Sequence, residues 1–572
     1  MQFATKSEKA TVYVAVYNAL GWERSEILSL PVSSSSNYSV TRVGSEKEIN
    51  DIDSALHVNM NSANVPEAAP FNLFFDTGDI KPAAFALYKI TKGDPTNVEE
   101  PKLSRIPSKM IENSVSRKLR QTEHRISNKD LKSMVVGNGV FEITLKSDST
   151  PEIKHSGTNT SLKMNLDWGF YRSFQGEEEG SQTQSVNKDN SEKSQNSGAY
   201  IFRPSSPNEE LELLTIDPAK TKIHRSNLLT EIHFGFEVPW IKQTWKMFEK
   251  KNYVDVDYTI GPIPIKDGVG KEVIARLRTN IVNDGEFFTD SNGREFMKRK
   301  RSNRSTWDFK EFQPIAGNYY PVNSAIYIED SKASLAIITD RTQGGSSLRD
   351  GSIELMVHRR TVKDDARGVG EAINETIGMD PYPPYGDAKR LGEGLVISGT
   401  HRIVVGDENN GALISRMNMD SVFSPLHMFV SSNSQNRDIS FPKGGEAALN
   451  KSLPPNIQLI TVKLLSSGID SVKILLRLGH AFGEGEADGL SEPVLVDISH
   501  LLTNYKVKSI AEKTLSGNQD RSVWEQNKMI WTNDSLQNKS VKSIAPDKIF
   551  CFVLNPMEIK TFEIEADRVN VK

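Results

Sequence analysis

Acidic and basic side chains gather between residues 340 and 367, beside segments that have the composition of buried strands. Charged groups close to a core are paired with one another or serve a function, because an unpaired buried charge is costly. A guanidinium group can hold a carboxylate in a two-point contact. This stretch is therefore the first candidate for a site. Its members are Asp340, Arg341, Arg349, Asp350, Arg359, Arg360, Asp364, Asp365 and Arg367.

Other patterns that could support catalysis are weak or absent in the sequence. Glu177–Glu179 offers neighbouring carboxylates, and hydrolysis of a glycoside requires two carboxyl groups held rigidly around the sugar. However, they lie in the polar segment Gly176–Asn196, which is predicted to be a disordered loop. The ten histidines show no spacing typical of a metal site, and neither a serine-nucleophile elbow nor a phosphate-binding glycine loop is found. The residues alone therefore indicate a binding or scaffold protein rather than a complete enzyme.

The elements that must position the charged stretch are strands. Ser324–Ile328, Ala333–Thr339 and Ser352–His358 alternate or are rich in β-branched residues, and the sequence predicts a meander from them. Asn292-Gly293 is typical of a tight primed turn in a hairpin. Strand-like segments recur up to about residue 405 without a convincing amphipathic helix. So many antiparallel strands must curl into two packed sheets.

We therefore predict an all-β protein with several domains. A large two-sheet antiparallel super-sandwich is expected at residues 131–405, between a small β-sandwich at residues 1–90 and a C-terminal β-sandwich at residues 410–572. Residues 91–130 are charged and polar, which is typical of a linker or a solvated excursion. A length of 572 residues is ample for several cores.

Composition narrows the classes of partner. The net charge of −4 gives no reason to expect nucleic acid, and the basic run Lys298–Arg304 lacks interleaved aromatic residues. No segment approaches the roughly 18 apolar residues of a membrane-spanning helix. No signal peptide is recognised, because Ala10–Tyr17 alternates like a strand. The single cysteine, Cys551, leaves no disulfide within the chain.

Several segments resemble one known family. GNYYPVNSAIYI (317–328), DRTQGGSSLRDGSIELMVHRR (340–360) and KDDARG (363–368) are similar to the C-terminal half of the lysosomal-type α-mannosidases of glycoside hydrolase family 38. The resemblance continues in the same order through SGAYIFRP (197–204), IGPIPI (260–265), GKEVIARL (270–277), FTDSNGREF (288–296), LPPNIQLITV (453–462) and NPMEIKTF (555–562).

The resemblance implies the β half of a retaining exo-α-mannosidase, which removes terminal non-reducing α-D-mannose from N-glycans and oligosaccharides. It also implies a galactose-mutarotase-like super-sandwich. In such enzymes a preceding α/β domain holds a zinc ion, an aspartate nucleophile and an aspartate acid/base. This chain is therefore expected to contain no catalytic residue, to bind no zinc and to be inactive without a catalytic N-terminal half. The implied ligands are mannose-terminated glycans, the implied location is lysosomal, vacuolar or extracellular, and a homo-oligomer stays open.

Two positions are implied to reach the sugar-binding site from the β side. They are the tyrosine of SGAY, Tyr200, and an arginine of the strand that ends in HRR, either Arg359 or Arg360. Neighbours on a strand point to opposite faces, so only one of these arginines is expected to face the site. A phenol can hydrogen-bond a sugar hydroxyl, and a guanidinium can clamp a carboxylate of the catalytic domain. The alternative is a core tyrosine and an ion pair within the sheet. The residues expected to fix a nearby turn are Asp364, Asp365 and Arg367.

Seven Asn-x-Ser/Thr sequons are candidate glycosylation sites and permit a secretory origin. They are Asn37, Asn159, Asn303, Asn374, Asn450, Asn533 and Asn538.

A second class of function stays open, namely a stand-alone carbohydrate-binding or interaction module without catalysis. A former enzyme half would expose a broad apolar face where the missing domain docked, whereas an independent module would carry polar residues there.

Overall fold

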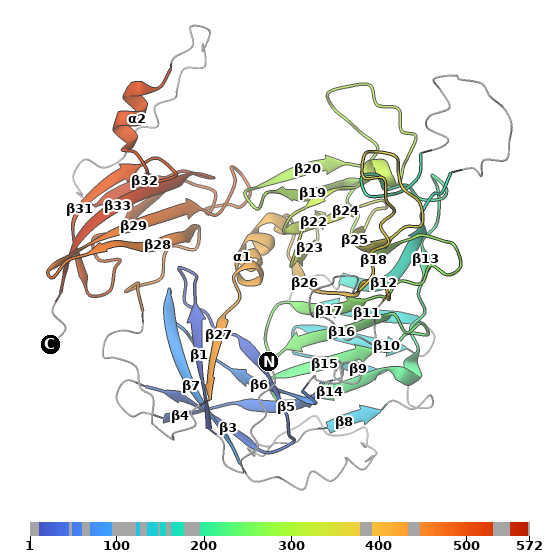
Figure 1. Cartoon of the computed structure of the whole chain (residues 1–572), viewed down its shortest axis with the longest axis horizontal. Coiled ribbons are helices and arrows are strands. Elements are labelled where there is room, and N and C mark those ends of the chain that lie inside the picture. The colour runs from blue at the N-terminus through green and yellow to red at the C-terminus, as the bar shows by residue number, and fades with distance from the viewer. Residues whose placement is uncertain are drawn as a thin grey trace. The chain divides into compact units, whose positions relative to one another are not determined.

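The computed structural model describes residues 11–44, 49–59, 69–93, 122–125, 134–146, 149–155, 162–176, 195–377, 392–432, 447–529 and 550–569. Contacts divide the chain into two compact units: Pro101–Val422 is one, and Met1–Glu100 together with Phe423–Lys572 is the other. Both units are built mainly of strands, which pair antiparallel throughout the described residues (Figure 1). The all-β prediction is confirmed.

Two large sheets form the unit Pro101–Val422. The nine-stranded sheet has the order β21 (Tyr320–Val322), β24 (Gln343–Ser346), β25 (Ser352–Arg360), β18 (Lys271–Thr279), β12 (Leu162–Arg172), β11 (Ser149–His155), β10 (Phe141–Lys146) and β9 (Met134–Gly137), with β13 (Glu212–Leu213) paired to β12. The ten-stranded sheet has the order β20 (Glu295–Lys300), β19 (Glu286–Ser291), β22 (Ala325–Glu329), β23 (Ser334–Thr339), β26 (Ile397–Gly406), β17 (Val254–Ile260), β16 (Ile241–Phe248), β15 (Leu229–Phe234), β14 (Lys222–Arg225) and β8 (Thr122–Arg125).

One hydrophobic core joins these two sheets. Along β18 the alternate residues Val273, Ala275 and Leu277 belong to it, as the period of two in a strand requires. Trp168 of β12 and Trp245 of β16 bring the two sheets together in the same core. The two-sheet super-sandwich is thus confirmed. The opposite face of β18 carries polar Glu272 and Arg276 beside Ile274, which belongs to a separate small cluster.

The predicted meander is only partly correct. Its three strands are observed as β22, β23 and β25, each with bounds within two residues of the predicted ones. However, β22 pairs with β23 in the ten-stranded sheet, whereas β25 pairs with β24 and β18 in the nine-stranded sheet. The chain therefore crosses between the sheets after β23, which strand periodicity alone does not reveal. The predicted turn Asn292-Gly293 has φ of 51° and 69° and joins β19 to β20, as a primed turn requires.

Helix α1 (Gly411–Phe423) was not predicted. Ala412 and Met419 pack on Tyr327 of β22 and Val404 of β26, outside the main core. Figure 1 shows the helix beside the ten-stranded sheet. Polar Ser415 and Arg416 are also buried on the helix, which obscures the amphipathic pattern in the sequence.

In the unit of Met1–Glu100 and Phe423–Lys572, the described residues form four sheets. A five-stranded sheet has the order β27 (His427–Ser432), β1 (Thr11–Asn18), β7 (Ala84–Lys92), β3 (Tyr38–Val43) and β4 (Ile49–Ile52), and packs with the sheet β2 (Ile27–Val32), β6 (Phe71–Asp76) and β5 (Ser54–Val58). A second core joins β28 (Ile457–Ser467), β29 (Ser471–His480), β33 (Ile559–Arg568) and β31 (Tyr505–Lys513) to the pair β30 (Val494–Asp497) and β32 (Cys551–Leu554). A short helix, α2, spans Arg521–Asn527.

The expected division into segments at residues 90, 130 and 405–410 stays a prediction. Most of the segment 91–130 and residues 177–194, including Glu177–Glu179, lie outside the described residues. Within the first of these, Thr122–Arg125 form β8 and pair with β14.

No helix in the described part of the chain is long and apolar enough to cross a membrane.

Candidate functional site

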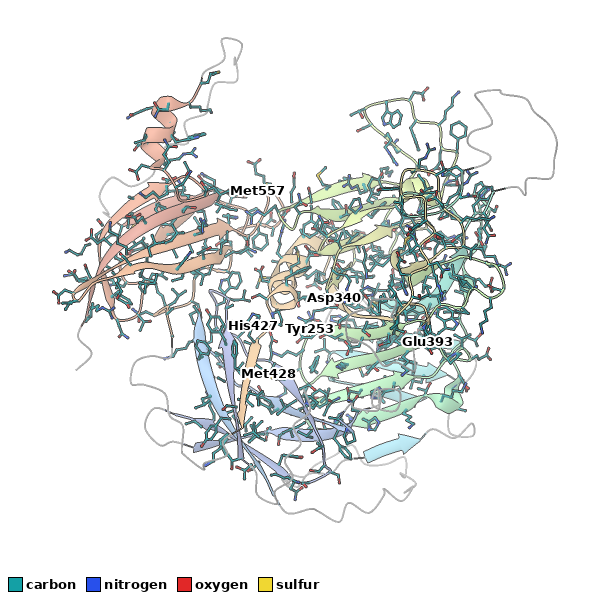
Figure 2. All side chains as sticks on the ribbon, in the orientation of Figure 1. Tyr253, Asp340, Glu393, His427, Met428 and Met557 are labelled. Atoms are coloured by element: carbon teal, nitrogen blue, oxygen red, sulfur yellow. The ribbon has the colours of Figure 1, made fainter. Side chains whose placement is uncertain are left out.

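The charged residues that the sequence singled out form specific pairs. Asp340, labelled in Figure 2, directly follows β23. Its Oδ2 accepts a hydrogen bond from the amide of Thr400 at 3.0 Å, and Arg341 donates to both of its oxygens. Asp350 Oδ1 accepts from Arg301 Nη2 at 3.0 Å. Asp340 thus ties the end of β23 to β26, and Asp350 joins two turns, as the cost of an unpaired charge near a core requires.

Tyr200 lies on an exposed turn rather than in the core. The tyrosine is 67% exposed. The turn is closed by a hydrogen bond from the amide of Gly198 to the carbonyl of Ile201 at 2.9 Å. Asp365 lies beneath it and is only 1% exposed. Its Oδ2 accepts from the amides of Tyr200 and Ile201 at 2.6 and 3.0 Å.

Arg359 is tied to the same turn. It lies at the end of β25, opposite Glu272 of β18, a residue that is 0% exposed. Arg359 Nη2 donates to Glu272 Oε1 at 3.1 Å and to the carbonyl of Ile201 at 2.8 Å, and Nε also donates to the carboxylate. The hydroxyls of Ser173 and Ser197 donate to Glu272 Oε1 at 3.1 and 2.7 Å. The buried carboxylate is thus fully surrounded by donors, as a buried charge must be.

Arg360 points to other partners. Its Nη1 donates to the carbonyl of Ile263 at 2.7 Å, and its Nε donates to Asn374 Oδ1 at 2.8 Å. A Cβ on Gly394 would lie 2.2 Å from Nη1, so only a glycine allows this close approach. The structure therefore brings Tyr200 and Arg359 together and places Arg360 in a different set of contacts.

A cleft of about 530 Å³ runs along the open edge of β25. Pairing of β25 with β24 ends at Met356. On this edge, residues 357–360 therefore border the cleft rather than a neighbouring strand. The register between β25 and β18 also shifts at this point, a bulge of the kind that redirects side chains. Both Arg359 and Arg360 line the cleft, together with Gln343 and His358.

The two histidines near the cleft are neutral structural groups. His358 Nε2 donates to the carbonyl of Leu395 at 3.2 Å, and burial lowers the pKa of His358. His401 is buried behind Gln343 and donates to its Oε1 at 2.9 Å, and burial lowers the pKa of His401 to about 4. Gln343 donates in turn to the hydroxyl of Tyr258 at 3.0 Å, and burial raises the pKa of Tyr258 to about 12. Neither His401 nor Tyr258 therefore changes its protonation state near neutral pH.

No group of three or more His, Cys, Asp or Glu within the described ranges could hold a metal ion. Those residues therefore do not fit a zinc site of their own. The expectation that the family's zinc is bound outside this chain stays a prediction.

The sequons differ in their surroundings. Asn37 and Asn303 are exposed, whereas Asn374 accepts the bond from Arg360. Asn450 Nδ2 donates to the carbonyls of His500 and Leu502, both at 3.2 Å, so a glycan there would compete with these bonds. The remaining sequons, Asn159, Asn533 and Asn538, lie outside the described residues.

The fold and the ordered motifs define a class of protein. Residues 136–367 match the model of the glycosyl hydrolases family 38 C-terminal domain, so the chain carries this domain. A protein of family 38 from Enterococcus faecalis has the same fold over 98% of this chain and 59% of its own, with a TM-score of 0.55 at 11% identity.

The individual relatives are α-mannosidases. An α-mannosidase of Arabidopsis thaliana is 31% identical over 97% of this chain and 51% of its own length. The lysosomal α-mannosidase of Bos taurus is 38% identical over 64% of this chain and 35% of its own length. The chain spans about half the length of the first of these relatives, and the match falls in their C-terminal part.

The sequence did not single out Glu272, and it singled out Asp365 without indicating that this residue holds the turn of Tyr200. Glu272 lies in the motif GKEVIARL (270–277) but was not named as a site residue. A carboxylate within a strand of buried residues was itself a sign of a paired or functional charge. Asp365 was expected to fix a nearby turn, and its Oδ1 does accept from the amide of Arg367. Its Oδ2 also holds a second turn, 165 residues away, which carries Tyr200.

Proposed function

We propose that this chain is the β portion of a retaining exo-α-mannosidase that hydrolyses terminal non-reducing α-D-mannose residues of N-glycans and oligosaccharides. The observation that carries the proposal is the alignment of 97% of the chain with an α-mannosidase, at 31% identity. Zinc, the nucleophile and the acid/base are proposed to come from a catalytic half outside this sequence. The lysosomal relatives support a lysosomal or vacuolar location.

The residues of this chain would bind and orient the sugar rather than break the glycosidic bond. Tyr200 carries an exposed ring on a turn that is held at its backbone, so its hydroxyl is available for a sugar hydroxyl. Arg359 holds the same turn through the carbonyl of Ile201. Arg360 borders the cleft, but its Nη1 already donates to the carbonyl of Ile263 and its Nε to Asn374 Oδ1. These bonds favour a role in supporting the site rather than in contacting the sugar.

The test is α-mannosidase activity on a chromogenic α-mannoside with added zinc. The purified chain is measured alone and after co-expression with the N-terminal half of the Arabidopsis relative. We expect no turnover from the chain alone and turnover from the co-expressed pair. Turnover by the chain alone would contradict the proposal and place the catalytic carboxylates within it. Mannoside binding without turnover in either preparation would favour the stand-alone carbohydrate-binding module.

A further inference from the structure

We propose that Asp365 is a positioning residue that presents Tyr200 to the sugar. The proposal rests on the proposed function, because the role of Tyr200 at the sugar belongs to that function. Asp365 itself touches no ligand in this proposal. It acts only through the backbone of the turn that carries the tyrosine.

Asp365 holds the turn through its side-chain carboxylate. Its Oδ2 accepts two consecutive amides, from Tyr200 at 2.6 Å and Ile201 at 3.0 Å. Its Oδ1 accepts from the amide of Arg367 at 3.1 Å, which orients the carboxylate from its own segment. Hydrogen bonds to a charged acceptor are about twice as strong as those between neutral groups. One side chain thus fixes the two peptide groups on either side of the tyrosine's α-carbon.

Arg359 holds the same turn at a carbonyl, whereas Asp365 holds it at amides. Arg359 Nη2 donates to the carbonyl of Ile201 at 2.8 Å, so residue 201 is fixed at both its amide and its carbonyl. Gly198 lets the turn lie directly on Asp365, since a Cβ at that position would be 2.7 Å from both the amide nitrogen and the Cβ of Asp365. The backbone of residues 198–201 therefore has little freedom to move.

The carboxylate of Asp365 is buried, whereas the tyrosine side chain on the turn above it is exposed. Burying a carboxylate is costly, so a buried charge in a surface turn needs a reason beyond closing that turn. Here Asp365 is 1% exposed, and the turn above it directs a 67% exposed aromatic side chain outward. When the backbone beneath an exposed ring is already rigid, less conformational entropy is lost as a ligand contacts the ring. This is the general advantage of preorganisation.

Hydrogen exchange tests the clamp without reference to activity. In the native chain we expect the amides of Tyr200 and Ile201 to exchange slowly although the turn is exposed. Asp365→Ala should speed their exchange about tenfold or more. Asp365→Asn keeps one acceptor oxygen, so its exchange rates should lie between those of the wild type and of Asp365→Ala. Asp364→Ala is the matched control, because Asp364 Oδ2 accepts from the amide of Ala366 and does not touch the turn. Unchanged exchange in Asp365→Ala would overturn the proposal.

Kinetics of the co-expressed pair test whether Asp365 acts through the tyrosine. We expect Tyr200→Ala and Asp365→Ala each to raise KM more than they lower kcat, and Asp364→Ala to leave both unchanged. In the Tyr200→Ala background, Asp365→Ala should have no further effect. An equal loss in both backgrounds would show a merely structural role and overturn the proposal. If the wild-type pair has no activity, the proposed function fails, and the exchange measurement still decides whether Asp365 holds the turn.

Discussion

At the scale of single residues, two buried carboxylates each accept several hydrogen bonds near the end of β25 in the nine-stranded sheet. Glu272 and Asp365 are both almost fully buried, and their donors come from segments distant in sequence. Removing one partner of a buried pair is far more damaging than removing a pair at the surface, because the remaining charge stays buried.

We predict that Arg359→Ala lowers the free energy of unfolding by about 3 kcal/mol. The reason is that Glu272 keeps only serine hydroxyls as side-chain donors after the substitution. The measurement is urea unfolding of the full chain followed by tryptophan fluorescence. Arg349→Ala is the control, since Arg349 pairs with Glu210 where both side chains are about 70% exposed, and it should cost less than about 1 kcal/mol. Equal losses in the two variants would contradict the prediction.

A second prediction concerns His401 and pH. Burial lowers its pKa to about 4 in the folded protein, whereas an unfolded histidine titrates near 6.5. Between these values the unfolded chain takes up a proton that the folded chain refuses, so stability is full above about pH 6.5 and falls as the pH decreases. We expect a loss of about 2 kcal/mol from this group between pH 7 and pH 5.

The measurement is the urea unfolding of wild type and His401→Gln at the two pH values. Glutamine keeps a donor for Gln343 and does not titrate, so the variant should lose less stability on acidification than wild type. Identical pH dependence in both proteins would remove His401 as a cause. His358 contributes with the same sign, because burial lowers its pKa too.

The site could be predicted from the sequence only in part. Tyr200 and Arg359 were named because their motifs resemble a family, and the structure does place both at one turn. Their partners could not be named, since Glu272 and Asp365 reach them across 87 and 165 residues. Spacing along a chain carries no information about such distant contacts.

At the scale of elements, strands such as β17 were predictable because one face is buried and the side chains alternate. Strand β23 is buried on both faces and was predictable from its β-branched residues instead. Helix α1 was not predicted because polar residues lie on its buried face. Its buried face includes Ser415, which donates to the carbonyl of Gly411, and Arg416, which donates to the carbonyls of Gly293 and Arg294. These contacts satisfy polar groups that a sequence pattern counts as exposed.

We predict that Gly411→Ala displaces α1 from the ten-stranded sheet. A Cβ on Gly411 would lie 2.1 Å from Cδ2 of Tyr327, a buried ring that cannot move away easily. The Gly411 amide also donates to Glu329 Oε2 at 2.9 Å, so the start of the helix is fixed at this point. The expected cost is about 1–3 kcal/mol, measured by urea unfolding. Met417→Ala, at an exposed position of the same helix, is the control and should be nearly silent.

At the scale of the whole molecule, the unit of Met1–Glu100 and Phe423–Lys572 depends on segments from both parts of the chain. Strand β27 pairs with β1 from Val12↔Ser432 to Tyr17↔His427. Further contacts follow the same pattern, since Trp22 Nε1 donates to the carbonyl of Pro454 at 3.0 Å. The strand pattern predicts β1, but it predicts neither β27 nor the pairing of these two strands.

We predict that residues 1–422 expressed alone lose the protection of the amides of β1, because the edge next to β27 becomes open. Hydrogen exchange measures this directly. Adding residues 423–572 as a separate chain should restore slow exchange in β1, while strands such as β18 remain protected throughout. A stable fragment 1–422 with fully protected β1 amides would show that the unit does not need its second segment.

The pairing of β27 with β1 also has a consequence for how the protein is made. About 410 residues separate Asn18 from His427, and a ribosome adds roughly 5–20 residues each second. The first strand thus waits roughly 20–80 s for its neighbour. During that interval its free edge is open to other nascent chains, so a chaperone that shields early strands should raise the yield of soluble protein more than one that acts after release.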